Sequence, residues 1–208
     1  MNKALLEAQD QAQFEGLILG LLDNQYGVCD GFLDETTLIG LRANLENYIQ
    51  AGEMHPAGVG KKFDYQKNAM VRGDMIHWID QNPTNPFEAL FIEKVSHFVD
   101  YLNKSCYTRI NDIEFHYAQY EPGSFYKRHL DQFKRDKGRK FSLVIYLNEH
   151  WTESDGGNIS LFVDENNVIE IFPIGGRAVF FRSDEMEHEV NPSFTRNRIS
   201  IAGWLKSV

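Results

Sequence analysis

The second half of this chain consists of short hydrophobic runs separated by turn residues, and this pattern constrains the fold more than any other feature. From about residue 111, β-branched and aromatic runs alternate with Gly, Pro, Asn and Asp. Such runs are typical of strands, and their regular spacing is typical of a sandwich or a barrel. We expect strands at 113–120, 141–147, 158–163, 168–172, 177–181, 188–191 and 198–204, with turns at 122–123, 155–157, 165–167 and 175–176.

The first half has helical periodicity. Asp34 can cap a helix over about 35–49, in which leucines recur every three or four residues. Asn85-Pro86 can begin a second helix with a long apolar stripe. A third helix is expected over about 2–22, although two glycines lower the helix propensity there. We expect these helices to pack their apolar faces on a sheet.

Length and charge limit the classes of protein to which this chain can belong. At 208 residues it is long enough for one domain with a substantial core. Thirty acidic residues against 21 Lys and Arg give a formal net charge of -9. Such a charge disfavours general binding to nucleic acids or anionic membranes, so a basic or neutral partner fits better.

Targeting signals and a disulfide framework are not expected. The first residues contain no uninterrupted apolar stretch, and no later run approaches the roughly 20 residues of a membrane helix. The two cysteines, Cys29 and Cys106, are far apart in no metal-like spacing. We therefore expect a soluble, unprocessed cytoplasmic protein with reduced thiols.

The sequence His129-x-Asp131, followed much later by His188, predicts a metal site. On a strand, residues two apart point to the same face with Cα atoms roughly 6–7 Å apart, so both can reach one ion. Two imidazoles and one carboxylate without cysteine favour Fe(II) with open coordination positions, although zinc, manganese or nickel could bind the same groups. His-x-Asp alone is a weak signal, because it also arises by chance.

A buried arginine can supply an anchor for a co-substrate. Arg198 follows His188 by ten positions in a predicted strand, and a guanidinium binds a carboxylate through two parallel hydrogen bonds. Arg198 is therefore a candidate partner for a dicarboxylate. The neighbouring Arg196 is the better candidate for a surface arginine.

Several motifs in order carry a resemblance to a known family. They are YEPGSFYKRHLD at 120–131, VIYLNEHW at 144–151, HEVNP at 188–192 and VRGDMIHWI at 71–79. Together they resemble the Fe(II)/2-oxoglutarate prolyl 4-hydroxylases, most closely the oxygen-sensing prolyl hydroxylases of animals and their bacterial relatives. The resemblance runs from about residue 26 to 205. It implies a mainly β fold, a double-stranded β-helix of the jelly-roll or cupin type flanked by amino-terminal helices.

The resemblance also divides the single domain of residues 1–208 into two parts. Residues 1–105 are expected to form helical support and a flap, and residues 106–206 the Fe(II)/2-oxoglutarate dioxygenase core. Within that core it implies that His129, Asp131 and His188 bind iron. It implies that Arg198 pairs with the distal carboxylate of 2-oxoglutarate, with Tyr146, Tyr120 and Ser142 as further contacts. The co-substrates would be 2-oxoglutarate and O2, with ascorbate added in assays.

Further residues are expected on the substrate side of the metal. The resemblance places Trp204, Tyr126, Arg72, Asp74 and Arg139 there, and we expect a salt bridge between Asp74 and Arg139. The stretch from Gly58 to Asp74 is expected to cover the substrate, with a mobile loop from Ala57 to Gln66. The remaining histidines are expected at the surface or as hydrogen-bonded core residues: His55, His77, His97, His116 and His150.

The resemblance implies hydroxylation of prolyl residues in a protein substrate, and bacterial members of that branch are associated with elongation factor Tu. The metal motif does not separate this reading from the same chemistry on a free amino acid, a small metabolite or another protein side chain. A third alternative is a non-catalytic β-helix that uses its metal for structure or for ligand sensing. Neither a nucleic acid nor a membrane is an expected partner.

Overall fold

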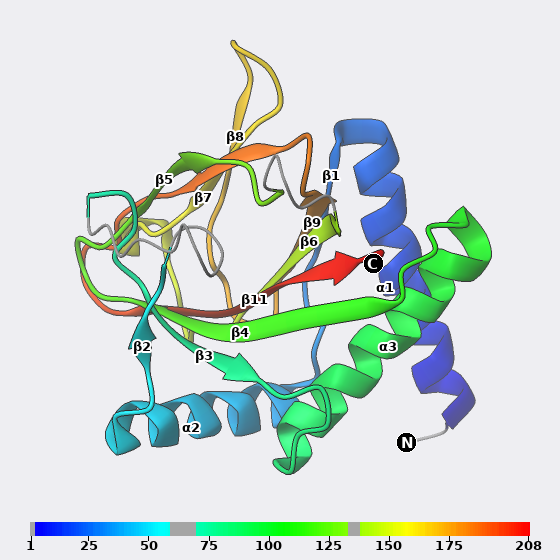
Figure 1. The fold of residues 1–208 in the computed structure, drawn as a ribbon, viewed down its shortest axis with the longest axis horizontal. Helices are drawn as coiled ribbons and strands as arrows, with labels where there is room; N and C mark the ends of the chain where they lie inside the picture. Colours follow the sequence, from blue (N-terminus) through cyan, green and yellow to red (C-terminus); the bar gives the residue numbers. More distant parts are fainter. Residues whose placement is uncertain (1–2, 59–69, 133–137) are drawn as a thin grey trace.

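The computed structural model describes residues 3–58, 70–132 and 138–208, which form helices at the amino-terminal end and mostly strands thereafter (Figure 1). The described helices are α1 (Lys3–Asn24), α2 (Glu35–Ala51) and α3 (Pro86–Cys106), with a short 3-10 turn, η1, at Glu153–Asp155. The described strands are β1 (Tyr26–Cys29), β2 (His55–Pro56), β3 (Met75–Ile79), β4 (Asp112–Tyr120), β5 (Tyr126–His129), β6 (Arg139–Tyr146), β7 (Ile159–Phe162), β8 (Val168–Ile171), β9 (Ala178–Arg182), β10 (Glu187–Val190) and β11 (Arg198–Lys206).

The strands form two antiparallel sheets. The larger sheet has the order β1-β9-β6-β11-β4-β3-β2, and the smaller has the order β5-β10-β7-β8. Figure 1 shows the smaller sheet above the long strands β4 and β11 of the larger one. Strands distant in sequence thus become neighbours, as β5 and β10 do. This is the arrangement expected of a double-stranded β-helix.

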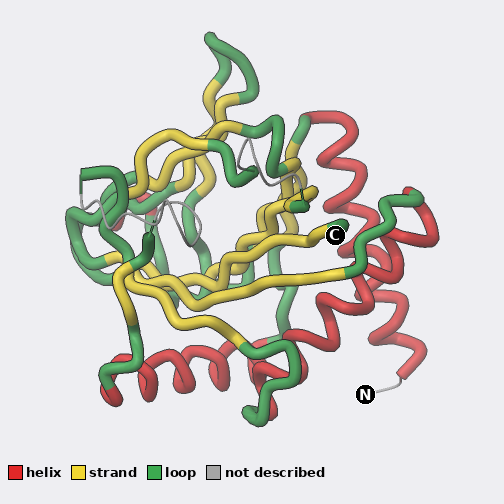
Figure 2. Tube along the Cα trace, viewed as in Figure 1, coloured by secondary structure: helices red, strands yellow, loops and turns green. Residues whose placement is uncertain are grey.

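Three hydrophobic clusters hold these layers together, the smallest of which joins Ala118 and Tyr120 of β4 to Val190 of β10. The larger cluster fills the space between the helices and the outer face of the larger sheet, and Figure 2 shows the helices gathered on that side. Phe91 and Phe98 of α3 pack there against Phe115 and Phe180, with ring centroids 5.1 Å apart in both pairs. A smaller cluster around Leu161 and Phe181 joins the two sheets. Most of the apolar burial therefore lies on the helical side, away from the inner pocket.

The predicted helices are confirmed, and their ends follow the expected caps. Asp34 accepts a hydrogen bond from the Thr37 amide at 3.0 Å, and Asn85 accepts one from the Phe87 amide at 2.9 Å. These side chains satisfy amides that have no partner within the helix. Gly52 ends α2 with φ 70°, a left-handed conformation that glycine adopts without strain.

The first helix tolerates its glycines because one of them provides room for packing. A Cβ at Gly20 would lie 2.8 Å from the Cα of Gly27 in β1, and a Cβ at Gly27 would lie 2.2 Å from the Leu17 carbonyl oxygen. Only glycine at both positions lets α1 lie this close to the edge strand. Gly20 therefore lowers the helix propensity of α1 but allows the helix to pack closely over β1.

All seven strands expected from the second half are present, with ends shifted by one or two residues. Four further strands, β1, β2, β3 and β5, lie outside these seven, and each is short, with five residues at most. Both cysteines are free thiols, as expected. Among the described residues, no helix is long and apolar enough to cross a membrane.

Candidate metal centre

A cavity of about 180 Å³ lies between the two sheets and is lined by residues of both. One water needs only about 10–15 Å³ of such space, so the cavity can hold an organic molecule. The side chains of β4, β6 and β11 form one wall, and those of β5, β7 and β10 form the opposite wall. The residues predicted to bind metal and co-substrate converge on this cavity.

Three side chains place one ligand atom each within 4.8 Å of one another: His129, Asp131 and His188. The register of β5 and β10 sets His129 directly opposite His188. Asp131 lies two residues beyond the end of β5, so of the two residues in His-x-Asp only His129 belongs to the strand. Its two carboxylate oxygens lie 3.6 Å from His129 Nε2 and 3.6 Å from His188 Nε2.

Backbone carbonyls orient both imidazoles. His129 Nδ1 lies 2.7 Å from the Lys127 carbonyl oxygen, and His188 Nδ1 lies 3.1 Å from that of Met186. A carbonyl only accepts, so each Nδ1 carries the proton and donates it. Each Nε2 is then left as a lone pair directed at the common point, which is the usual arrangement of a histidine that binds metal.

The protonation states also suit a cation. Burial lowers the pKa of His188 to about 4, so its imidazole is neutral near pH 7. Burial alone would raise the pKa of Asp131, but the His188 and His129 imidazoles and the Ser142 hydroxyl hold it well below its usual range. The site therefore presents the neutral His188 imidazole, the ionised Asp131 carboxylate and Nε2 of His129, a donor set that fits Fe(II).

Ser142 contacts a metal ligand. Its hydroxyl donates to Asp131 Oδ2 at 2.7 Å and lies 2.9 Å from the Ser183 hydroxyl. The expected contact between Ser142 and 2-oxoglutarate stays a prediction. The hydrogen bond in the structure gives Ser142 a different role, which is to fix the orientation of the Asp131 carboxylate.

Replacing Ser142 with alanine should weaken Fe(II) binding about 10-fold, because hydrogen-bond partners of metal ligands typically contribute 10- to 100-fold. Calorimetric titration of the metal into the apoprotein measures this effect. Ser154→Ala, in the exposed η1 turn, is the matched control and should bind metal like the wild type. Equal affinities for all three proteins would show that Ser142 does not support the carboxylate.

Arg198 contributes a buried cationic side chain to the wall of the cavity. It is 2% exposed, donates from Nε to the Gly157 carbonyl oxygen at 2.8 Å, and lies about 5 Å from the ring centroids of Tyr120 and Tyr146. The Tyr146 hydroxyl is fully buried and has no hydrogen-bond partner among the described residues. Burial raises the pKa of both tyrosines, so each keeps its proton. A buried guanidinium beside an unpaired hydroxyl fits a carboxylate of 2-oxoglutarate.

Strand alternation places Trp204, which is expected on the substrate side, in the cavity wall that also contains Arg198. Arg198, Ser200, Ala202 and Trp204 all line the cavity, as their spacing along β11 predicts. The Arg139 guanidinium lies 3.3 Å above the Trp204 ring and donates to the Asp131 carbonyl oxygen at 3.2 Å. Trp204 and Arg139 therefore lie beside the metal site.

The predicted salt bridge between Asp74 and Arg139 is wrong. Asp74 instead accepts two hydrogen bonds from Arg72, at 2.7 and 2.6 Å, and Arg139 lies 3.6 Å from Glu114. Arg72 and Asp74 are two residues apart on extended backbone, so both side chains point the same way. A local pair therefore forms in place of the distant one.

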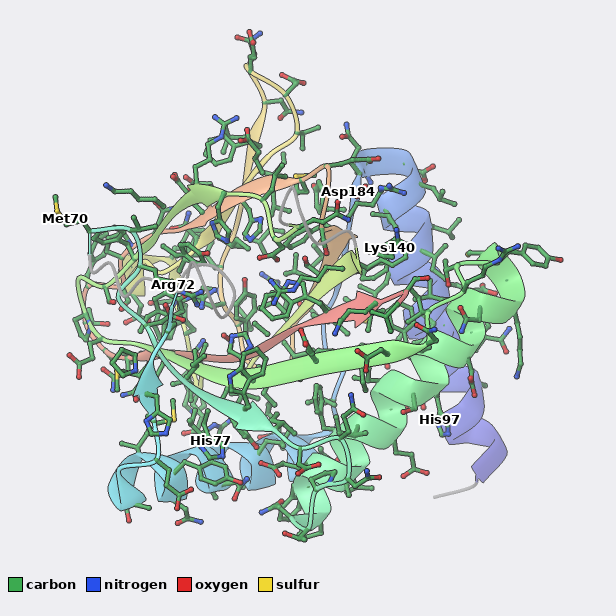
Figure 3. All side chains as sticks on the ribbon, in the orientation of Figure 1. Met70, Arg72, His77, His97, Lys140 and Asp184 are labelled. Atoms are coloured by element: carbon green, nitrogen blue, oxygen red, sulfur yellow. The ribbon has the colours of Figure 1, made fainter. Side chains whose placement is uncertain are left out.

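Arg72 also connects the described end of the flap to the metal strand. Its guanidinium lies 4.2 Å from the centroid of the Tyr126 ring, and the other face of that ring stacks on His129 at 3.5 Å. A backbone hydrogen bond from Lys127 to Val71 joins the same segments. Figure 3 shows Arg72 between the two sheets. Residues 59–69, which include most of the predicted flap and mobile loop, lie outside the described residues.

Replacing Asp74 with alanine should lower the free energy of unfolding by about 3 kcal/mol, because it leaves the Arg72 charge without its partner. The Asp74 side chain is fully buried and that of Arg72 is 12% exposed. Chemical denaturation measures the change. The control is Asp30→Ala, which removes a similar two-bond pair with Arg177 at the surface, where the loss should stay below about 1 kcal/mol. Equal losses for both variants would contradict the prediction.

Two residues of the cavity had no sequence signal for a site. Trp78 of β3 lines the cavity and is 51% exposed, and it lies beside Trp204 at 6.3 Å between ring centroids. His116 of β4 also lines the cavity, but it is buried and its Nδ1 has no hydrogen-bond partner among the described residues. The expectation that His116 is a surface or hydrogen-bonded histidine is therefore wrong.

Comparison with known proteins agrees with this geometry. Residues 115–206 match the family model of the 2OG-Fe(II) oxygenase superfamily. A prolyl-4-hydroxylase from Pseudomonas putida is 31% identical, with a TM-score of 0.85 over 93% of this chain and 99% of that one. A prolyl hydroxylase from Trichoplax adhaerens, in complex with a hypoxia inducible factor peptide, is 26% identical, with a TM-score of 0.82 over 100% of this chain and 94% of that one.

One match to a curated protein is more limited. Prolyl 3-hydroxylase OGFOD1 from Xenopus laevis is 31% identical over 77 residues, which are 33% of this chain and 15% of that protein. The similarity therefore concerns a small part of a longer relative. The two solved structures, by contrast, extend over almost the whole of this chain, including its helices and both sheets.

Proposed function

Because this chain belongs to the 2OG-Fe(II) oxygenase superfamily, we propose that it is a dioxygenase that hydroxylates prolyl residues of a protein substrate. Its fold is the double-stranded β-helix of that superfamily. The observation that carries the proposal is one cavity lined both by the His129, Asp131 and His188 triad and by buried Arg198. This pairing fits an Fe(II) ion and a 2-oxoglutarate that reaches between them.

The residues of the chain bind and orient the reactants. His129, Asp131 and His188 would hold the iron, and Arg198 with Tyr146 would hold the distal carboxylate of 2-oxoglutarate. Bound Fe(II) and 2-oxoglutarate supply the oxidising chemistry with O2, in which one oxygen atom enters a substrate C–H bond and the other enters succinate, with release of CO2. Asp131 stays ionised, and the buried tyrosines stay protonated. No side chain has to act as a general acid or base.

A peptide substrate is supported by two features. The structure from Trichoplax adhaerens, similar over the whole of this chain, contains a peptide bound to a prolyl hydroxylase. At the cavity of the present chain, half-exposed Trp78 offers an aromatic surface on which a prolyl ring can pack. We place the enzyme in the cytoplasm, with elongation factor Tu as the first protein to test.

The test is succinate release from 2-oxoglutarate with Fe(II) and ascorbate, with and without proline-containing peptides. We expect peptide-stimulated release together with the mass of one added oxygen on proline. Peptides with alanine in place of proline should not be hydroxylated. If free proline or a small metabolite stimulates succinate release and no peptide does, the substrate is a small molecule and not a protein. Absence of any turnover in folded, iron-loaded protein would identify a non-catalytic binding protein instead.

A further inference from the structure

His116 lies in the wall of the cavity where the substrate would enter. On β4 it pairs with Trp78 of β3 and with Ala202 of β11. Its ring centroid lies 4.9 Å from that of Trp78 and 5.5 Å from that of Trp204. It is thus a polar side chain set between two tryptophans.

The His116 imidazole has no hydrogen-bond partner among the described residues that would explain a polar side chain at this position. His77, His129 and His188 each place Nδ1 on a backbone carbonyl oxygen, Glu53 in the first case. His116 makes no hydrogen bond among the described residues, and of its two ring nitrogens only Nδ1 is wholly enclosed. Enclosing an unpaired polar atom is unfavourable, and a methionine or leucine at this position would avoid that loss. Packing alone therefore does not account for a histidine here.

The state of the ring determines what it can offer to a ligand. Burial, with the charges of Arg72 and Arg139, lowers the pKa of His116 to about 4, so the ring is neutral near pH 7. Buried N–H groups without partners are rarer than buried unpaired acceptors. The favoured tautomer therefore encloses Nδ1 as an acceptor and carries its proton on Nε2, at the edge of the ring that is not enclosed.

We infer that His116 determines substrate specificity by donating a hydrogen bond from Nε2 to a main-chain carbonyl oxygen of the bound prolyl segment. A prolyl residue has no amide N–H, so near its ring the peptide offers mainly acceptors. A donor between two aromatic side chains matches that chemistry. This inference rests on the proposed function and adds a residue to its substrate site.

The test compares His116→Met, which removes the donor, with His116→Gln, which keeps an N–H donor of similar reach. For a hydroxylated prolyl peptide, His116→Met should raise KM and Kd roughly 3- to 10-fold, as expected for one hydrogen bond. His116→Gln should stay within about 2-fold of the wild type. The KM for 2-oxoglutarate should change in neither variant. Peptide Kd is measured with Zn(II) in place of iron, through the fluorescence of Trp78 and Trp204.

His97→Met is the matched control, since His97 is exposed on α3, away from the space between the sheets (Figure 3). A second arm uses peptides with a single thioamide at the prolyl residue or at the residue before it. One of them should bind less well to the wild type but not to His116→Met. If His116→Met fails to fold, thioamide peptide binding to the wild type and to His116→Gln tests the inference instead. Both proteins should then lose affinity for the same thioamide peptide.

Four results would overturn the inference while leaving the proposed function intact. Three concern the variants: unchanged peptide KM in His116→Met, equal impairment of the Met and Gln variants, and a loss confined to 2-oxoglutarate affinity. The fourth is insensitivity of the wild type to both thioamides. Failure of wild-type protein to bind or hydroxylate any prolyl peptide, despite active turnover of 2-oxoglutarate, would instead remove the proposed substrate class and this inference with it.

Discussion

Replacing Asp131 with alanine should abolish iron-dependent turnover while the fold is kept. Asp131 is the single carboxylate of the triad, and one of its oxygens lies 3.6 Å from His129 Nε2 and the other 3.6 Å from His188 Nε2. Hydrogen-bond partners of metal ligands alone contribute about 10- to 100-fold in affinity, so loss of a direct ligand should exceed about 100-fold. The remaining imidazoles supply no negative charge to hold a divalent cation.

Two measurements separate metal loss from unfolding in Asp131→Ala. Metal titration should show weak binding and the succinate assay no turnover, whereas circular dichroism should match the wild type. The control is Asp23→Ala, at an exposed position of α1, which should bind metal and turn over normally. Normal activity of Asp131→Ala would exclude Asp131 from the ligand set.

Replacing Arg198 with alanine should raise the 2-oxoglutarate requirement roughly 30- to 3000-fold. Removing one partner of a buried charge pair costs about 2–5 kcal/mol, and each 1.4 kcal/mol corresponds to a tenfold change. The distal carboxylate would be left beside Tyr146 and Tyr120 without a cation. Iron binding should change little, because Arg198 does not belong to the triad. Arg198→Lys should recover only part of the loss, since lysine keeps the charge without the two-bond geometry.

The measurements for Arg198 are the KM and the calorimetric Kd for 2-oxoglutarate, with metal binding recorded in parallel. Arg196→Ala is the control, because the Arg196 side chain is 41% exposed and bonds to Asp155 and to the His150 carbonyl oxygen. Its 2-oxoglutarate affinity should equal that of the wild type. If Arg198→Ala leaves the requirement unchanged and Arg196→Ala raises it, the role belongs to Arg196.

The sequence predicts elements whose signals are local. Asp34 and Asn85 mark helix starts because an amide cap depends only on neighbouring residues. The metal residues could be predicted because donor type and strand alternation restrict which side chains can share an ion. The two strands that hold them are nevertheless brought together by the fold, and the short strand β5 had no hydrophobic pattern of its own.

The wrong predictions concern the choice between partners. The sequence offers Arg72 and Arg139 as partners for Asp74. Sequence spacing does not show that Arg139 contacts Glu114 and Trp204 in the folded chain. Ser142 lies on a strand that passes both the metal and Arg198, so its neighbour depends on side-chain geometry. The missing partner of His116 is a property of the packed wall and has no signature in composition or periodicity.

The sandwich of Tyr126 between Arg72 and His129 has a thermodynamic consequence. An ion that fixes the His129 ring also fixes the surface on which Tyr126 stacks, and Tyr126 in turn supports Arg72 and the segment after it. Reciprocity then requires that docking of this segment strengthen metal binding by the same free energy. We therefore expect amide hydrogen exchange at residues 70–74 to slow when the metal binds, so that a segment without a metal ligand reports the occupancy of the site.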